Sequence, residues 1–303
     1  MSIMPESMDI LITTEQNVEE AAAGHVGKQV GLRGVPSQDV LGVLRSLVQR
    51  SRRRSGVQVP ELFIRRADQS LDVPPLALLL RGGQGGEVRL KLYLTMLLLA
   101  VRPPFDIREP VPARSWAAAL GIPDPENRGA RRVGDAITWL AEHKFLETER
   151  RQGAPGAVRL LHSDLSGHPY VRPTERERYI TLPLGLWEQG WIARLSGTAL
   201  ALMIVLLDMQ SARTEPQWIS PAQARRRYDL SPDTWSKALK ELTAFELVTI
   251  LRRPQGGEFN YQRMRNAYWV RTDLLRDVNA AGNQGKLEGG THGAAVMDHL
   301  LAP

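Results

Sequence analysis

Apolar residues recur with helical spacing along much of the chain, which predicts a mainly helical protein. In the stretch 37–55 they share one face, and Ser37 precedes them as a candidate N-cap. The stretch 87–104 is apolar on all sides and ends at Pro103 and Pro104, which predicts a buried helix stopped by proline. Further helices are predicted over 112–123, 128–145 and 196–212, and a helix–turn–helix over 221–247.

Two basic stretches, 145–161 and 247–264, interrupt the helical pattern in the same way. Each begins apolar, reaches an Arg-Arg pair, breaks at a turn that contains glycine and resumes as an extended run. Each is therefore predicted to form a β-hairpin, with Arg150 and Arg151 on the first and Arg252 and Arg253 on the second. A short strand is predicted at 217–220, and 57–80 is predicted as extended segments with a turn at Pro74-Pro75.

The two halves of the chain can be aligned as an internal repeat. A shift of 102 residues matches Ala136 with Ala238, Leu140 with Leu242, and the first Arg-Arg pair with the second. A shift of 107 matches the buried helices, and a shift of 108 matches Leu120 with Tyr228. The matches fall on apolar positions, as expected if one fold occurs twice with different surfaces.

Composition limits the classes of protein that the chain can belong to. It has 303 residues, enough for two or three domains, and it contains no cysteine, which excludes disulfides and thiolate metal sites. The net charge of +6 is compatible with nucleic acid as a partner but is too small to establish it. No signal peptide or membrane span is legible, so we expect a cytoplasmic, nucleoid-associated protein without a membrane partner.

The stretch 219–250 resembles the winged helix-turn-helix of plasmid replication initiators, phage replisome-organising proteins and related transcription regulators. The residues that carry the resemblance are Ser231, Thr234, Trp235, Lys237, Ala238, Leu239, Leu242, Leu247 and Val248. Glu246 stands where the family has glycine, and in the first half Asp135 stands where a basic residue is usual. The resemblance covers roughly 87–273 and implies two tandem winged helix-turn-helix domains, with small β-wings, behind an N-terminal helical and extended segment.

The resemblance also implies where DNA would bind. A recognition helix enters the major groove, the preceding helix crosses the backbone and the wing lies beside it. Trp139 and Trp235 are expected to pack in the core rather than stack on bases. The predicted DNA-binding residues are Arg128, Arg131, Arg132, Thr138, Arg150, Arg151, Arg225, Arg226, Ser231, Thr234, Ser236, Lys237, Lys240, Arg252 and Arg253.

The implied organisation divides the chain into six parts. They are a flexible arm (1–36), a helix and extended segment that is a candidate for oligomerisation (37–80), a first winged-helix domain (81–161), a linker (162–178), a second winged-helix domain (179–275) and a disordered tail (276–303). The Arg cluster at 50–54 either contacts phosphate or is a solvated helix end.

No constellation in the sequence indicates an enzyme, a cofactor or a metal site. His162 and His168 do not have metal-ligand spacing, and the glycine-rich stretch 81–87 lacks the lysine of a phosphate-binding loop. We therefore expect a non-catalytic protein that binds specific sequences of double-stranded DNA, as a replication initiator of a plasmid or mobile element or as a transcription regulator. Expected partners are duplex DNA, a second copy of the chain, and replication or transcription machinery. The alternative is a tandem winged-helix scaffold that docks proteins, of the kind found among chromosome-partition or polymerase-associated factors.

Overall fold

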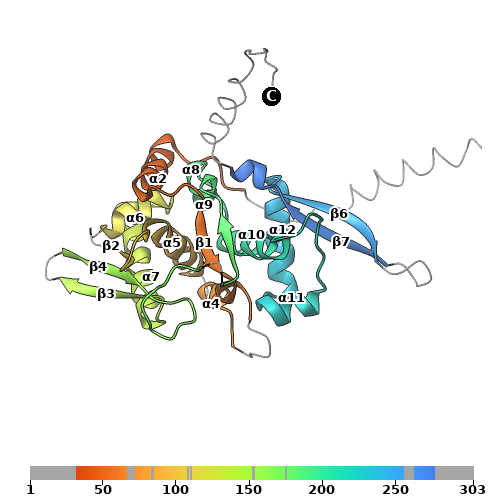
Figure 1. Cartoon of the computed structure of the whole chain (residues 1–303). Coiled ribbons are helices and arrows are strands. Elements are labelled where there is room, and N and C mark those ends of the chain that lie inside the picture. Colours follow the sequence, from red (N-terminus) through yellow and green to blue (C-terminus); the bar gives the residue numbers. More distant parts are fainter. Residues whose placement is uncertain are drawn as a thin grey trace, which may run out of the picture. The chain divides into compact units, whose positions relative to one another are not determined.

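The computed structural model describes residues 32–66, 72–82, 85–107, 109, 111–151, 154–174, 176–255 and 263–276; the side chains at 150, 151, 154, 155, 255 and 263 are outside this description. Apart from Leu32, these ranges belong to one compact unit that starts at Arg33. Within them helices predominate and the strands form small antiparallel sheets, which confirms the mainly helical α+β class (Figure 1). The predicted arm and tail fall almost entirely outside the described residues.

The two predicted repeats have the same order of elements: a buried helix, a short strand or bridge, two helices and a hairpin (Figure 1). In the first repeat, β2 pairs antiparallel with the second hairpin strand, β4; in the second, Gln217 forms an antiparallel bridge with Tyr268 of β7. The elements of the first repeat are α5 (Gly86–Leu99), β2 (Asp106–Ile107), α6 (Ala113–Ala119), the π-helical turn η2 (Pro125–Gly129), α7 (Ala130–Glu142), β3 (Leu146–Arg151) and β4 (Ala154–Leu160). Those of the second are α10 (Gly197–Gln210), α11 (Pro221–Tyr228), α12 (Pro232–Ala244), β6 (Val248–Gln255) and β7 (Arg263–Val270).

Burial supports the alignment of the repeats at each of its three shifts. Leu140 and Leu242 are both completely buried, and so are Met96 and Met203. Tyr228, the partner of Leu120 in the alignment, is buried to the same degree as that leucine. Corresponding apolar residues therefore fill corresponding places in the two repeats.

The ends of α7 and α12 show the same correspondence in the backbone. Lys144 and Glu246, which the 102-residue shift aligns, both adopt the left-handed conformation, with φ of 60° and 58°. At the end of α7, the N–H of Phe145 donates to the carbonyl of Leu140, and the N–H of Lys144 donates to the carbonyl of Ala141. At the end of α12, the N–H groups of Leu247 and Glu246 make the same two bonds, to the carbonyls of Leu242 and Thr243. This bond pair is the Schellman motif, which usually has glycine at the left-handed position. Glu246 therefore preserves the helix end that the missing glycine had placed in question.

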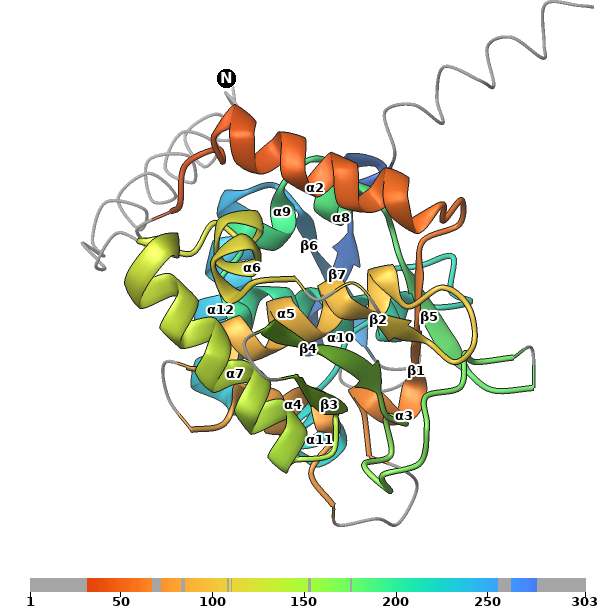
Figure 2. The same ribbon diagram turned by 90° about the vertical axis from the view of Figure 1, so that its left-hand side faces the viewer.

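The segment before the repeats is an integral part of the unit. It comprises α2 (Gln38–Ser51), β1 (Val57–Pro60), α3 (Glu61–Ile64) and α4 (Pro75–Leu80), and β1 pairs antiparallel with β5 (Tyr179–Leu182), as Figure 2 shows. Ser37 caps α2 as predicted, but Pro74-Pro75 begins a helix instead of forming a turn, because proline is tolerated in the first turn of a helix.

The apolar face of α2 does not provide the dimer surface that the sequence suggested. Leu41, Leu44 and Val48 on this face are buried within the unit, where α2 packs against α5, α6 and α8 (Gly185–Glu188). A homodimer remains a prediction, but this face of α2 does not support it.

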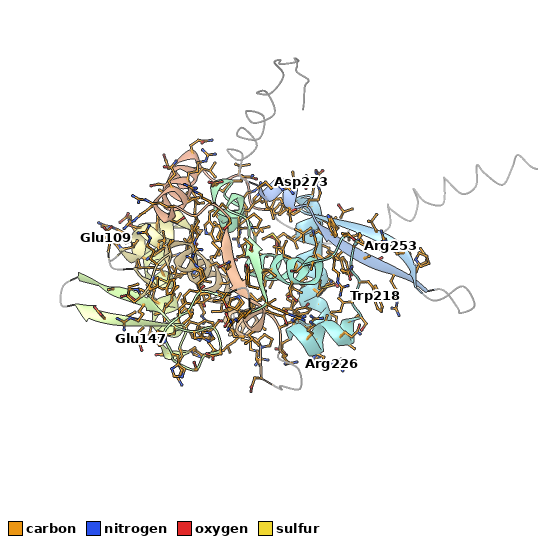
Figure 3. The ribbon with its side chains drawn as sticks, viewed as in Figure 1. Glu109, Glu147, Trp218, Arg226, Arg253 and Asp273 are labelled. Carbon is orange, nitrogen blue, oxygen red and sulfur yellow. The ribbon has the colours of Figure 1, made fainter. Side chains whose placement is uncertain are left out.

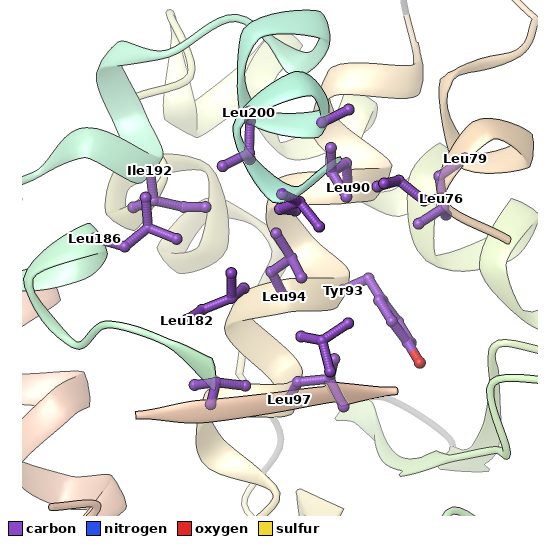
Figure 4. Close-up of a cluster of buried hydrophobic side chains, with 14 of the residues drawn as sticks. Leu76, Leu79, Leu90, Tyr93, Leu94, Leu97, Leu182, Leu186, Ile192 and Leu200 are labelled. Atoms are coloured by element: carbon purple, nitrogen blue, oxygen red, sulfur yellow. The ribbon is translucent and has the colours of Figure 1, made fainter. Parts of the chain in front are cut away.

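One hydrophobic core runs through both repeats. Side chains of α5, such as Leu94 and Leu97, lie in it with Leu76 of α4, Leu182 of β5 and Leu200 of α10 (Figure 4). The short helices α8, α9 (Trp191–Arg194) and η3 (Thr272–Leu275) complete the described structure. The division into domains at 81, 161 and 179 remains a prediction, and the shared core means that the two repeats pack as one body.

A polar cluster joins the two buried helices at their N-terminal ends. Lys91 is almost fully buried; its Nζ donates to the carbonyl of Ala193 at 3.0 Å and pairs with Glu87 at 2.8 Å. Burial raises the pKa of Glu87, but hydrogen bonds and charge from Arg33 and Lys91 outweigh burial and hold that pKa at about 2. Glu87 also accepts the N–H of Gly197 at 3.4 Å, which ties the start of α5 to the start of α10.

None of the described helices has both the length and the apolar composition required to cross a bilayer.

Candidate nucleic-acid interface

The third helix of the second repeat, α12, begins with an ordered cap. Ser231 precedes the helix, and its Oγ accepts the N–H of Thr234 at 3.1 Å. The two hydroxyl oxygens lie 2.9 Å apart, and both residues are half-buried. Ser231 and Thr234 thus fix the start of α12, and a contact with bases stays a prediction for them.

The solvent-facing side of α12 carries the predicted polar residues. Ser236, Lys237 and Lys240 are all exposed, and Lys237 pairs with Asp233 one turn earlier at 2.8 Å. Glu241 points elsewhere: its carboxylate accepts the N–H and the hydroxyl of Ser196, at 2.7 and 2.6 Å, at the start of α10. This acid of α12 is therefore a capping group directed away from the solvent-facing side of the helix.

The preceding helix, α11, presents its basic residues at its last turn. Arg225 and Arg226 are exposed, and their carbonyls accept hydrogen bonds from the Nη1 of Arg66 at 3.3 and 2.7 Å. Asp229 follows the helix and pairs with Arg66 at 2.7 Å and with Arg81 at 2.5 Å. One carboxylate pairs with two guanidinium groups here, so the turn between α11 and α12 keeps a net positive charge.

The hairpin β6–β7 adds arginines on two sides. Arg252 and Arg253 are both exposed, and they point to opposite faces because side chains alternate along a strand. Arg253 pairs with Glu215 at 2.7 Å, and Arg265 lies with its guanidinium carbon 5.4 Å from the ring centroid of Trp218. Sequence reasoning missed Arg265, as well as Arg66 and Arg81, because only the tertiary fold brings them to this surface.

A groove connects these elements. It has a volume of about 470 Å³ and lies between α11, α12 and the hairpin, with Ser236 and Arg252 among its lining residues. Figure 3 shows Arg226, Trp218 and Arg253 along the side of the unit that carries the second hairpin. The fold thus brings Ser236 of α12 and Arg252 of β6 to one groove, and it places Arg225 and Arg226 at the far end of α11.

The first repeat presents fewer of its predicted residues in a comparable setting. Arg128, Arg131, Arg132 and Thr138 are exposed on η2 and α7, and Asp135 is exposed among them. The side chains of Arg150 and Arg151 lie outside the described residues.

The hairpin of the first repeat has an acidic base. Glu147 and Glu149 are exposed on β3, and Arg159 of β4 pairs with Asp106 of β2 at 3.1 Å. These residues line a cavity of about 350 Å³. Glu147 lies on the opposite side of the unit from Arg253 (Figure 3). The two hairpins therefore differ in charge at the strands that the structure describes.

Both tryptophans on the third helices pack as predicted. Trp235 is buried and makes an edge-to-face contact with Tyr268, with ring centroids 5.7 Å apart. Trp139 stacks on His143 at 3.7 Å and carries the Arg89 guanidinium on its ring at 4.1 Å.

The arginine cluster that follows α2 is partly structural. Arg53 donates to the carbonyls of Leu97, Leu98 and Ala100 at 2.7–2.9 Å, and so closes the C-terminal end of α5. Burial lowers the pKa of Arg53 to about 10. Arg50 pairs with Glu109, while Arg52 and Arg54 are exposed. The sequence suggested that this cluster either contacts phosphate or is a solvated helix end. Arg53 does neither, because it caps the C-terminal end of the neighbouring helix α5.

Across the described ranges, no three His, Asp or Glu side chains come together as a metal site would require. Comparison with protein-family models, with curated proteins and with solved structures found no match to this chain.

Proposed function

We propose that the chain binds double-stranded DNA through two winged-helix units that share one core. The support is topological. Each repeat has three helices followed by a hairpin. Between the first two helices, the strand β2 in the first repeat and a bridge at Gln217 in the second pair with the hairpin. In this arrangement α7 and α12 are the recognition helices, and β3–β4 and β6–β7 are the wings.

The observation that carries the proposal is the basic surface of the second repeat. Lys237 and Lys240 face solvent on α12, with Arg226 on the preceding helix and Arg252 on the wing. A helix with its side chains is about 10–12 Å wide and fits the major groove of B-DNA, which is about 12 Å wide. With α12 in the groove, the cations of α11 and of the wing would meet the flanking phosphates.

The arrangement of the two repeats allows a long binding site. The two wings project on opposite sides of the shared core (Figure 1). If both recognition helices bind one duplex, the binding of the first unit holds the second unit close to the DNA. The effective concentration of the second unit then rises, and so does the overall affinity. Such a protein would act at the nucleoid, as the initiator of a plasmid or mobile element or as a transcription regulator.

Selection of bound fragments from the source genome tests this function. We expect enrichment of a common sequence at moderate salt. Sites clustered as repeats beside one origin would identify an initiator, and sites at promoters would identify a regulator. No enrichment, together with no retardation of any duplex at low salt, would contradict the proposal.

A second function is favoured for the first repeat by its charge. The exposed acidic groups at the base of its wing, Glu147 and Glu149, are unsuited to phosphate and suited to a basic protein surface. We propose protein docking by the first repeat as the alternative to DNA contact there. Capture of replication or transcription proteins that survives substitution of Lys237 and Lys240 would favour it.

A further inference from the structure

The groove beside α12 has the chemistry of a binding site. Trp218, Trp235 and Tyr268 provide aromatic walls, and Leu230 and Met264 extend the apolar surface. Its volume of about 470 Å³ lies in the range typical of small-ligand sites. Burial raises the pKa of Tyr268, so its hydroxyl stays protonated and the wall uncharged.

The charged groups of the groove favour an anion. They are Arg252 and Arg265, and no acidic residue is among its described lining residues. Asn266 and Ser236 add neutral hydrogen-bonding groups. Trp218 is 37% exposed, and the Arg265 guanidinium lies 5.4 Å from its ring centroid. An aromatic surface and a cation are thus adjacent at the rim, the combination that binds a base together with its phosphate.

We propose that this groove takes one unpaired nucleotide of a DNA strand, with its base against Trp218 and its phosphate on Arg265. The proposal rests on the proposed function, since α12 would bring the strand to the groove. A paired base cannot enter, because its ring faces are covered by stacking. The protein should therefore prefer duplex that is locally opened, which favours initiation of replication over simple repression.

The test compares the full chain on three labelled DNAs by fluorescence anisotropy at low salt: a paired duplex, the same duplex with a central bubble of thymines, and a thymine oligomer. Stacking on an aromatic side chain contributes enough for us to expect the bubble to bind about tenfold tighter than the paired duplex. Trp218→Leu should lower the affinity for the bubble to that for the paired duplex. Trp269→Leu, a tryptophan on β7 that does not line the groove, is the matched control.

A second pair of variants guards against misfolding. Met264→Glu adds a carboxylate in the groove at a position that is 53% exposed, and Leu251→Glu adds the same charge on the same hairpin outside it, at a position that is 41% exposed. Both should weaken paired duplex equally, and only Met264→Glu should abolish the preference for the bubble.

The outcomes separate this inference from the proposed function. Binding of paired duplex without preference for the bubble would overturn the inference and leave the function intact. Binding of the thymine oligomer through Trp218, with no binding of paired duplex, would overturn the function and retain the groove. If free thymidine monophosphate binds the groove as tightly as the thymine oligomer does, the groove is a site for a free nucleotide, and the strand-binding proposal is overturned.

Discussion

The two repeats share a backbone plan and differ in their surfaces. Leu140 and Leu242 are both fully buried, and Lys144 and Glu246 close their helices with the same left-handed residue. On the surface, the aligned positions 135 and 237 carry opposite charges. The comparison teaches that the corresponding core residues of the two repeats fix the position of the third helix and the hairpin. The exposed residues then decide whether the surface of that helix is charged to bind phosphate.

The largest expected effect on DNA affinity comes from removing three positive charges from one repeat or from the other. Replacement by Gln of Arg226, Lys240 and Arg252 together should lower the affinity for duplex about a hundredfold near 100 mM salt. The slope of the logarithm of affinity against the logarithm of salt falls by about one unit for every phosphate that is no longer neutralised. The same substitution of Arg128, Arg131 and Arg132 should lower it about tenfold or less. Equal losses of affinity in the two variants, measured by anisotropy, would erase the proposed difference between the repeats.

The second prediction concerns the junction of the repeats and its dependence on pH. The pKa of Glu87 is lowered from its ordinary value of 4.5 to about 2, so its charged form stabilises the fold above about pH 4.5. That contribution should disappear as the pH falls through the interval between these values, at a cost of about 3 kcal/mol. Denaturant unfolding of wild type and Glu87→Gln between pH 5 and 2 measures it, and Glu142→Gln on the exposed side of α7 is the control. The same acid dependence in Glu87→Gln would refute the assignment.

The third prediction exchanges charge between aligned positions. Asp135→Lys should raise duplex affinity about tenfold, because it removes an acid and adds a base beside Arg131 and Arg132. Lys237→Asp should lower affinity by a similar factor. If Asp135→Lys has no effect on anisotropy, α7 does not approach DNA, and the first repeat is better assigned to protein docking.

The smallest effects concern the two helix ends. A residue other than glycine in the left-handed conformation is strained by about 1 kcal/mol, so Glu246→Gly and Lys144→Gly should each raise the free energy of unfolding by up to about that amount. Thr243→Gly, inside α12, should lower it by about 0.5–1 kcal/mol. A gain at only one of the two positions would show that the helix ends are not equivalent.

Much of the fold could be predicted from the sequence because apolar periodicity reports burial directly. The helices at 38–51 and 197–210 and both hairpins stand where their patterns place them. The strand at Asp106 was missed, since two residues carry no period, and its pairing with β4 is set by the tertiary fold.

The candidate site was less predictable, because its geometry depends on residues distant in sequence. Arg66 clamps the end of α11 from about 160 positions away, and Arg53 caps a helix where charge alone suggested phosphate or solvent. Glu241 lies on α12, and only its hydrogen bonds to Ser196 show that it is directed against α10. Composition and spacing give the charge of such residues but not their partners.

The central claim is that the basic surface around α12 binds duplex DNA through its phosphates. Anisotropy of the full chain on a random duplex, measured between about 50 and 200 mM salt, tests it directly. With about five phosphate contacts, the logarithm of affinity should fall against the logarithm of salt with a slope of roughly −4 to −5. The Arg226, Lys240 and Arg252 variant should reduce that slope by nearly 3. No binding at the lowest salt, or a slope that this variant leaves unchanged, would contradict the account.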